Sequence, residues 1–186
     1  MVLENYVKAV LYAYPLLKTV EEDYAQHIEN KAVLSSRNSK TAEEVAYTIV
    51  SVIMEKRNLL WLKSLIEQTM QQLTEAERLL IAIRYFGKEK RIKRPLLRET
   101  YGNWSERKYF RDQARIGCRV ERLLRAAGLT KEVFEQDFAQ LSFFEKIYPF
   151  VCAGKDRAIT QSERRWFGTI AKGGEGKNRK NRKNGS

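Results

Sequence analysis

Residues 73–128 read LTEAERLLIAIRYFGKEKRIKRPLLRETYGNWSERKYFRDQARIGCRVERLLRAAG, and this stretch decides the fold. Thr74 and Glu77 form a capping box, in which each side chain bonds the other residue's backbone N–H. This box predicts a helix that begins at residue 75. The helix should stop at Gly87, because a glycine with left-handed backbone commonly closes a helix.

The second half of the stretch predicts a longer helix with a turn in front of it. Ser105 is a favourable N-cap, and the helix it opens should run to about Ala127 and end at Gly128. Before it, residues 96–101 are long enough for a short helix, and Gly102-Asn103 supplies a tight turn. This order of elements predicts a helix-turn-helix.

The N-terminal part predicts two further helices. Apolar residues recur at helical spacing over 2–34, where Pro15 should kink or split the helix. Thr41 with Glu44 is a second capping box and opens a helix over about 42–71. Two helices joined by a short polar break should fold back as an antiparallel hairpin. The sequence leaves open whether this hairpin is also a dimerisation arm.

The C-terminal part predicts helices followed by an unstructured tail. Thr130 caps a helix over 131–141, residues 143–152 form an aromatic-rich helical stretch, and 156–170 add a weak helix. The tail from residue 173 is too polar to bury anything and should be disordered. Six aromatic residues in this part either bind a partner or form a small satellite core over the hairpin, and we favour the core: Phe134, Phe138, Phe143, Phe144, Tyr148 and Phe150.

These signals predict an all-α chain, supported by only 3 prolines and 10 glycines in 186 residues. We expect a helical hairpin over 1–72, a helix-turn-helix over 73–128, a helical extension over 129–172 and a disordered basic tail over 173–186. The N-terminus has no apolar run long enough for a signal peptide or a membrane span. We therefore expect no membrane association and a cytoplasmic, nucleoid-associated protein.

The charge of the chain is concentrated in one segment. The net charge is +12, yet residues 1–86 carry 10 basic and 11 acidic side chains. Residues 87–125 carry 13 basic and 5 acidic side chains, and residues 173–186 carry 5 and 1. A focused basic segment is typical of a protein that binds a polyanion, and nucleic acid is the polyanion we favour.

The helix after Ser105 divides its residues between a core and a surface. Its buried stripe should comprise Tyr109, Ile116, Val120, Leu123, Leu124 and Ala127. In a helix-turn-helix the first turns of the second helix meet base edges in the major groove, and Arg107, Lys108 and Arg111 stand there. Contacts to phosphates are predicted for the capping serine, for one arginine a turn further on and for the linker cations: Ser105, Arg115, Lys88, Lys90, Arg91, Lys93 and Arg94.

The quoted stretch resembles region 4 of bacterial sigma factors, and more closely the phage and mobile-element regulators of the ArpU/RinA kind. The first-helix pattern of that family is matched by Leu73, Glu77, Arg78, Leu79, Leu80, Ile83, Arg84 and Tyr85. The resemblance implies that Glu106, Arg107, Lys108 and Arg111 read bases and that Tyr109 packs the helix onto its neighbour. It implies a sequence-specific transcription regulator that binds double-stranded DNA, with RNA polymerase and a second copy of the chain as further candidate partners.

Other functions were weighed against DNA-binding regulation. The single histidine, His27, has no metal-ligand spacing around it, and the two cysteines, Cys118 and Cys152, form no CxxC, so we expect no enzyme, cofactor or metal. Cys118 should be a small core residue. A DNA-binding oligomer of phage packaging, similar to a small terminase, would share the helix-turn-helix but form a ring. A sigma-like factor is a further alternative, and an exposed Phe110 would favour RNA.

Overall fold

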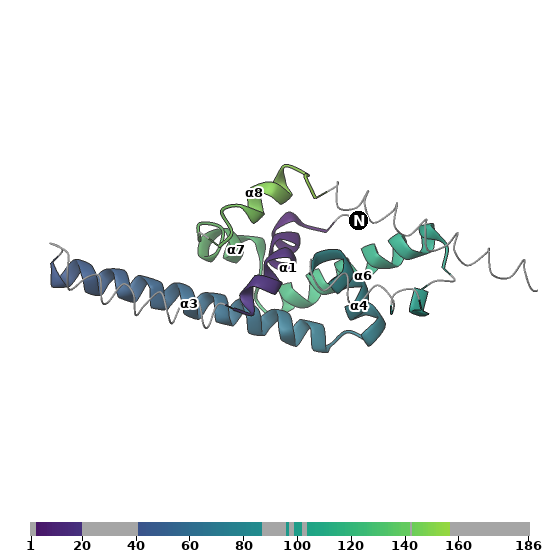
Figure 1. Cartoon of the computed structure of the whole chain (residues 1–186), viewed down its shortest axis with the longest axis horizontal. Helices are drawn as coiled ribbons and strands as arrows, with labels where there is room; N and C mark the ends of the chain where they lie inside the picture. Colours follow the sequence, from purple (N-terminus) through teal and green to yellow (C-terminus); the bar gives the residue numbers. More distant parts are fainter. Residues whose placement is uncertain are drawn as a thin grey trace, which may run out of the picture.

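The computed structural model describes residues 3–19, 41–86, 96, 99–101, 104–141 and 143–156. Over these ranges the chain consists of helices, turns and short connections, without a strand, which confirms the all-α prediction (Figure 1). None of the described helices is both long and apolar enough to span a membrane. The helices are α1 (Asn5–Leu17), α3 (Ala42–Gln71), α4 (Glu75–Tyr85), α6 (Glu106–Ala126), α7 (Lys131–Asp137) and α8 (Ile147–Cys152).

The helix starts lie where the capping residues predicted them. Thr41, Thr74, Ser105 and Thr130 are the N-caps of α3, α4, α6 and α7, and each side-chain oxygen accepts a hydrogen bond from the backbone N–H three residues on. In α3 and α4 the glutamate returns the bond, so both predicted capping boxes are present. Gly128 has a φ of 99°, the left-handed conformation that was expected to close α6.

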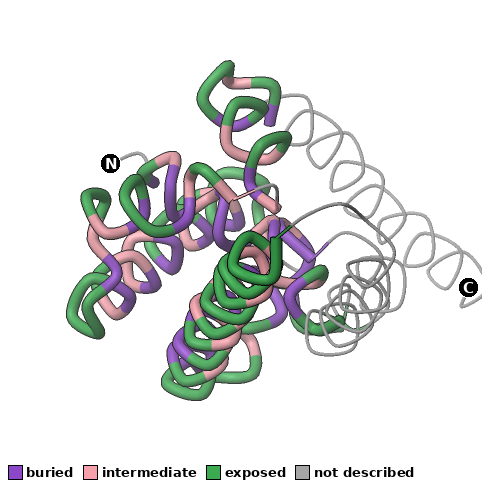
Figure 2. The backbone as a smooth tube through the Cα atoms, turned by 90° about the vertical axis from the view of Figure 1, so that its left-hand side faces the viewer, coloured by how far each residue is buried: buried purple, intermediate pink, exposed green. Residues whose placement is uncertain are grey.

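The first helix ends close to its proline, where the sequence predicted a kink or a split. Pro15 lies in the last turn of α1, which ends at Leu17. Residues 20–34, the rest of the predicted first helix, lie outside the described residues, so the hairpin with α3 stays a prediction. Within the described part, α1 packs against α3 on one side and against α8 on another. Seven of its thirteen residues are buried, because it lies inside the helical assembly (Figure 2).

All six helices contribute to one contiguous hydrophobic core. The predicted satellite cluster joins this core: Phe134, Phe138 and Phe144 are buried, and the Phe134 ring lies 6.0 Å from that of Tyr6 in α1. Phe150 is the exception, since it is exposed. The aromatic rings of the extension pack on one another, on Tyr6 of α1 and on Trp61 of α3.

Three details of the prediction were wrong. Ala127, assigned to the buried stripe of α6, is exposed because it is the C-cap residue, where the chain turns away. The helix predicted over 131–141 ends at Asp137, since the N–H groups of Phe138 and Ala139 both bond the Phe134 carbonyl. The stretch 143–152 begins with a turn, and only 147–152 is helical. Pro149 has no N–H, and in the first turn of α8 this costs no helical hydrogen bond.

An ion pair joins the last described residue of the extension to α1. Lys8 Nζ lies 3.3 Å from the carboxylate of Asp156, and both side chains are largely buried. Each charged group therefore needs the other as its partner, because an unpaired charge at a buried position destabilises the folded state. This contact joins residues that are 148 positions apart in the sequence.

We expect Asp156→Ala to lower the free energy of unfolding by roughly 3 kcal/mol, because the Lys8 ammonium is left without its partner. Urea unfolding monitored by circular dichroism measures this change. Asp137→Ala, which removes an exposed aspartate at the end of α7, is the control and should change stability by less than about 0.5 kcal/mol. Replacing both partners, with Lys8→Met and Asp156→Leu, should restore most of the lost free energy of unfolding. Equal effects of the two alanine variants would contradict a structural role for the pair.

Candidate nucleic-acid interface

The candidate interface is built on α6, whose first turn is fixed by Ser105. The Ser105 hydroxyl oxygen accepts a hydrogen bond from the Lys108 N–H at 3.3 Å. This bond satisfies one of the N–H groups that a helix start leaves unpaired. The N-terminal end of a helix of 21 residues carries a partial positive charge and favours anions. A phosphate contact of Ser105 thus remains a prediction, while its capping role is observed.

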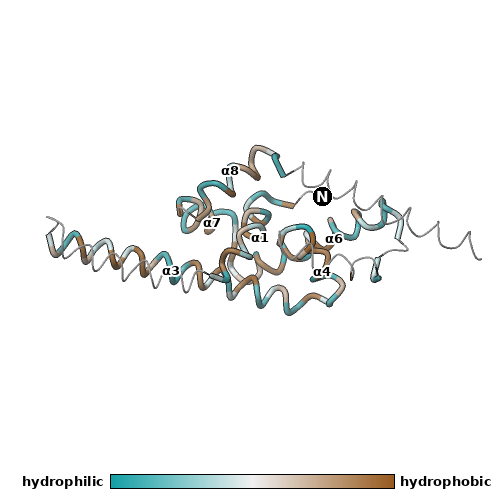
Figure 3. The backbone as a smooth tube through the Cα atoms, in the orientation of Figure 1, coloured by the Kyte–Doolittle hydropathy of each residue, from teal (hydrophilic) through white to brown (hydrophobic). Residues whose placement is uncertain are grey.

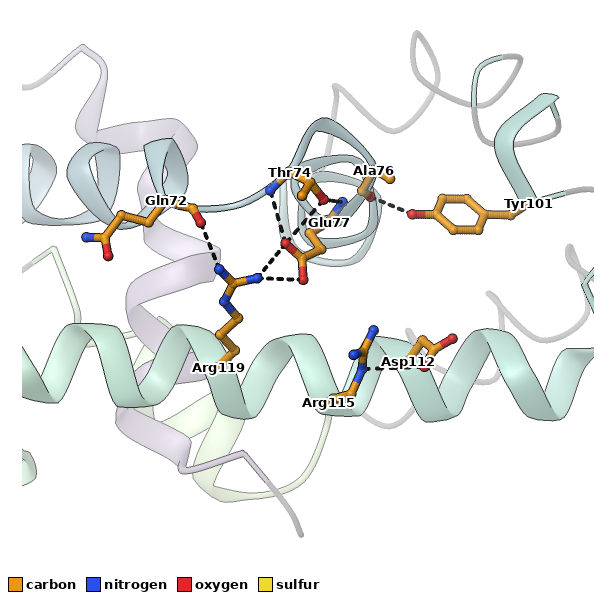
Figure 4. Close-up of polar contacts among 8 residues, drawn as sticks. All are labelled: Gln72, Thr74, Ala76, Glu77, Tyr101, Asp112, Arg115 and Arg119. Atoms are coloured by element: carbon orange, nitrogen blue, oxygen red, sulfur yellow. Dashed lines mark hydrogen bonds and ion pairs between the residues drawn. The ribbon is translucent and has the colours of Figure 1, made fainter.

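The orientation of α6 is set by an ion pair with the start of α4 (Figure 4). Arg119 Nη1 lies 2.9 and 2.8 Å from the two carboxylate oxygens of Glu77, and Nη2 donates to the Gln72 carbonyl at 3.0 Å. The same carboxylate accepts from the Thr74 N–H at 3.0 Å in the capping box. Burial raises the pKa of Glu77, but the hydrogen bonds from Thr74 and Arg119 outweigh this effect and hold the pKa below its ordinary value.

No partner for Arg119 was predicted from the sequence. In the structure it is the one basic residue of α6 that reaches across to α4. A signal was present in the sequence, because Arg119 adjoins the buried stripe at Ile116 and Val120. A long cationic side chain at the edge of a buried stripe can reach a neighbouring helix start that carries an acid.

A short helical turn precedes α6 in the chain and contacts both α4 and the start of α6. Residues 99–101 are helical, and the Tyr101 hydroxyl donates to the Ala76 carbonyl of α4 at 2.7 Å. The Tyr101 ring makes edge contacts with Trp104 at 4.6 Å and with Tyr109 at 6.3 Å. Burial first, and then the charges of two nearby carboxylates, raise the pKa of Tyr101 to about 12. The tyrosine therefore stays protonated and keeps donating at neutral pH.

The predicted core side of α6 is confirmed, apart from its last residue. Tyr109, Ile116, Val120 and Leu124 are buried, and Leu123 is half-buried. Phe110 is half-buried as well and meets the Tyr109 ring edge-on at 5.0 Å, so the exposed stacking surface that would favour RNA is not found at this residue. Cys118, predicted as a core residue, is only half-buried.

The opposite side of α6 is basic along its length. At 3.6 residues per turn, one face collects six exposed cations: Arg107, Lys108, Arg111, Arg115, Arg122 and Arg125. We call this set the arginine face. Glu121 borders this face and pairs with Arg125. From its first to its last member the face extends roughly 27 Å, at about 1.5 Å per residue. A groove of about 740 Å³ follows it. Its lining includes four arginines and two acids: Arg111, Arg115, Arg122, Arg125, Glu4 and Glu121.

The members of the arginine face differ in how far they are already engaged. Lys108 Nζ lies 3.9 Å from the centre of the Trp104 ring, a cation–π contact. Arg115 Nε lies 3.5 Å from Asp112, but its side chain is 72% exposed, so this pair is weak. Arg125 is held by Glu121 at 2.9 Å. No acid among the described residues pairs with Arg107 or Arg111.

The remaining predicted residues have the following places. Glu106 is exposed in the first turn of α6, beside the predicted base-reading cations. The linker cations Lys88, Lys90, Arg91, Lys93 and Arg94, and the turn Gly102-Asn103, lie outside the described residues. In the part of the chain that the structure describes, no three histidine, cysteine or acidic side chains are grouped so as to hold a metal ion.

Comparisons of the chain with protein families, with curated proteins and with solved structures give no match. The resemblance to sigma region 4 and to the ArpU/RinA regulators therefore stays a prediction from the sequence. The functional argument that follows depends on the geometry and charge of α6.

Glu77→Gln should destabilise the protein by about 1–2 kcal/mol at neutral pH, because a charged hydrogen-bond acceptor is lost beside a half-exposed arginine. Since the pKa of Glu77 is lowered in the folded state, its contribution is complete above the ordinary value of 4.5 and is lost as the pH falls through the folded value. The wild type and the variant should therefore differ less in their free energy of unfolding, measured with urea, at pH 3 than at pH 7. Glu75→Gln, in the same helical turn but exposed, should show little difference at either pH. A pH-independent gap for Glu77→Gln would contradict this assignment.

Proposed function

We propose that this protein binds double-stranded DNA through the arginine face of α6 and acts as a sequence-specific transcription regulator. The observation that carries the proposal is the arginine face itself: six exposed cations gather on one side of a capped helix, and among the described residues no acid pairs with Arg107 or Arg111. DNA presents one negative charge per about 1.7 Å of its axis, so a cationic face of roughly 27 Å has a matching row of phosphates.

The roles within the face follow from how each side chain is engaged. Arg107 and Arg111 are four residues apart near the helix start and have no acidic partner in the described part, so both are available to base edges. Arg115 gives up little when it exchanges its weak pair with Asp112 for a phosphate. Lys108 must leave the Trp104 ring before it reaches a base, at a cost of about 0.5–1 kcal/mol. We therefore rank the two arginines above Lys108 as base-reading residues.

Glu106 lies next to the arginine face in the sequence but carries the opposite charge. Its carboxylate can accept a hydrogen bond from the cytosine amino group in the major groove. In a phosphate track it would be repelled, so its position in the first exposed turn fits a base-reading end of the helix better than a purely electrostatic one. This supports sequence preference rather than uniform binding.

Binding of duplex DNA should weaken steeply as salt is added. Each phosphate contact contributes about −0.9 to the slope of log affinity against log salt, so three to four contacts from the arginine face and the linker give a slope of about −3 to −4. Fluorescence anisotropy with a labelled duplex, titrated at several salt concentrations, measures the slope. A slope near zero would exclude the basic segment as the contact surface, and stronger binding to single-stranded RNA in the same assay would overturn the choice of duplex DNA.

Two classes of substitution should separate base readers from phosphate contacts on a duplex selected from a random library. Arg107→Ala or Arg111→Ala should reduce the preference for the selected sequence by about 1–3 kcal/mol. Arg115→Ala or Lys90→Ala should weaken all sequences about equally and flatten the salt slope by about 1. Lys146→Ala, an exposed cation outside α6, is the control. Indistinguishable behaviour of the two classes would contradict the assigned roles.

A further inference from the structure

The N-terminal half of α3 carries apolar side chains that the described core does not use. In Figure 1 this half extends beyond the other described helices. Between residues 42 and 58 only Val52 is buried. On another side of the helix, Tyr47 is 79% exposed, Val50 is 56% exposed and Met54 is 50% exposed. Figure 3 shows hydrophobic segments continuing along this projecting half.

Most of the exposed residues form a single seam, and Ile53, which is 47% exposed, lies beside it. Tyr47, Val50, Met54, Arg57 and Trp61 follow one another at spacings of three, four, three and four residues, which places them on one side of a helix. This is the alternation of the a and d positions in a coiled coil. Trp61 is still 40% exposed, although its ring stacks on Phe138 at 6.0 Å. The turn before Tyr47 adds the exposed Glu43 to the same seam.

The charges of the seam select the orientation of its partner. Glu43 lies at one end and Arg57 towards the other, with apolar side chains between them. Two parallel copies would set Glu43 against Glu43 and Arg57 against Arg57, which is unfavourable. Two antiparallel copies bring each acid to the basic end of the other helix. A surface that complements its own reversed copy is the requirement for an interface with twofold symmetry.

We propose that the exposed seam of α3 is an antiparallel dimerisation surface for a second copy of this chain. In the register that centres on Val50 and Met54, each Val50 faces the Met54 of the other copy. Tyr47 then lies opposite Arg57, where an aromatic face can receive a guanidinium, and Glu43 lies within a turn of the same arginine. The seam is separate from the arginine face of α6, so the proposal holds or fails independently of DNA binding.

Sedimentation equilibrium of the full chain over a concentration series tests the dimer. The wild type should approach twice the 21.8 kDa of one chain. Val50→Glu places a charge at the centre of the seam and should raise the dissociation constant by about tenfold or more. Ser51→Glu adds the same charge one residue on, about 100° around the helix, and should dimerise almost as the wild type. A wild type that stays monomeric overturns the proposal, and residues 20–40 of the same chain would then be the candidates to cover the seam. A ring of many subunits overturns it as well and favours the packaging alternative.

A charge exchange tests the orientation and does not depend on the folding of one variant. Glu43→Arg and Arg57→Glu should each weaken the antiparallel dimer, since each brings like charges together across the interface. The chain with both changes should dimerise as the wild type does, because the complementary pair is restored with reversed signs. In a parallel dimer each position meets its own copy, so neither single change would weaken association. Circular dichroism confirms that each variant remains helical, and dimerisation unaffected by either single exchange would contradict the antiparallel arrangement.

Discussion

The ion pair between Glu77 and Arg119 fixes the relation between two helices that the rest of the candidate site needs. Glu77 closes the capping box of α4 and at the same time receives the guanidinium from the middle of α6. A helix that is held at one point of its circumference cannot roll about its axis. Arg115 and Arg122 stand one turn to either side of Arg119 and so share roughly its side of α6, but both remain exposed.

The basic residues of α6 look alike in the sequence, and the fold gives them different tasks. Arg119 and Arg125 form ion pairs with acids within the chain, whereas the cations near the helix start face away from the core. Such a division combines a rigid support with side chains that are free to meet a ligand. The charge that would bind DNA is therefore presented by an element whose own position does not depend on DNA.

Local signals in the sequence predicted much of the fold. Four capping residues and Gly128 placed helix starts and an end correctly, because caps act within a few residues. The partner of Arg119 and the buried pair of Lys8 with Asp156 were not predicted, since they join positions far apart in the chain. The exposed apolar seam of α3 was not predicted either. Helical spacing shows that apolar residues share a side, but not whether that side is covered.

The packing of α1 against α8 has a consequence for biosynthesis. Helix α1 finds part of its apolar cover only in residues 147–152, which are synthesised much later than α1. Until then its tyrosines, valines and leucines remain accessible to water or to chaperones. Because α1 and α8 are far apart in the sequence, we expect the packing of α1 to be completed late in folding.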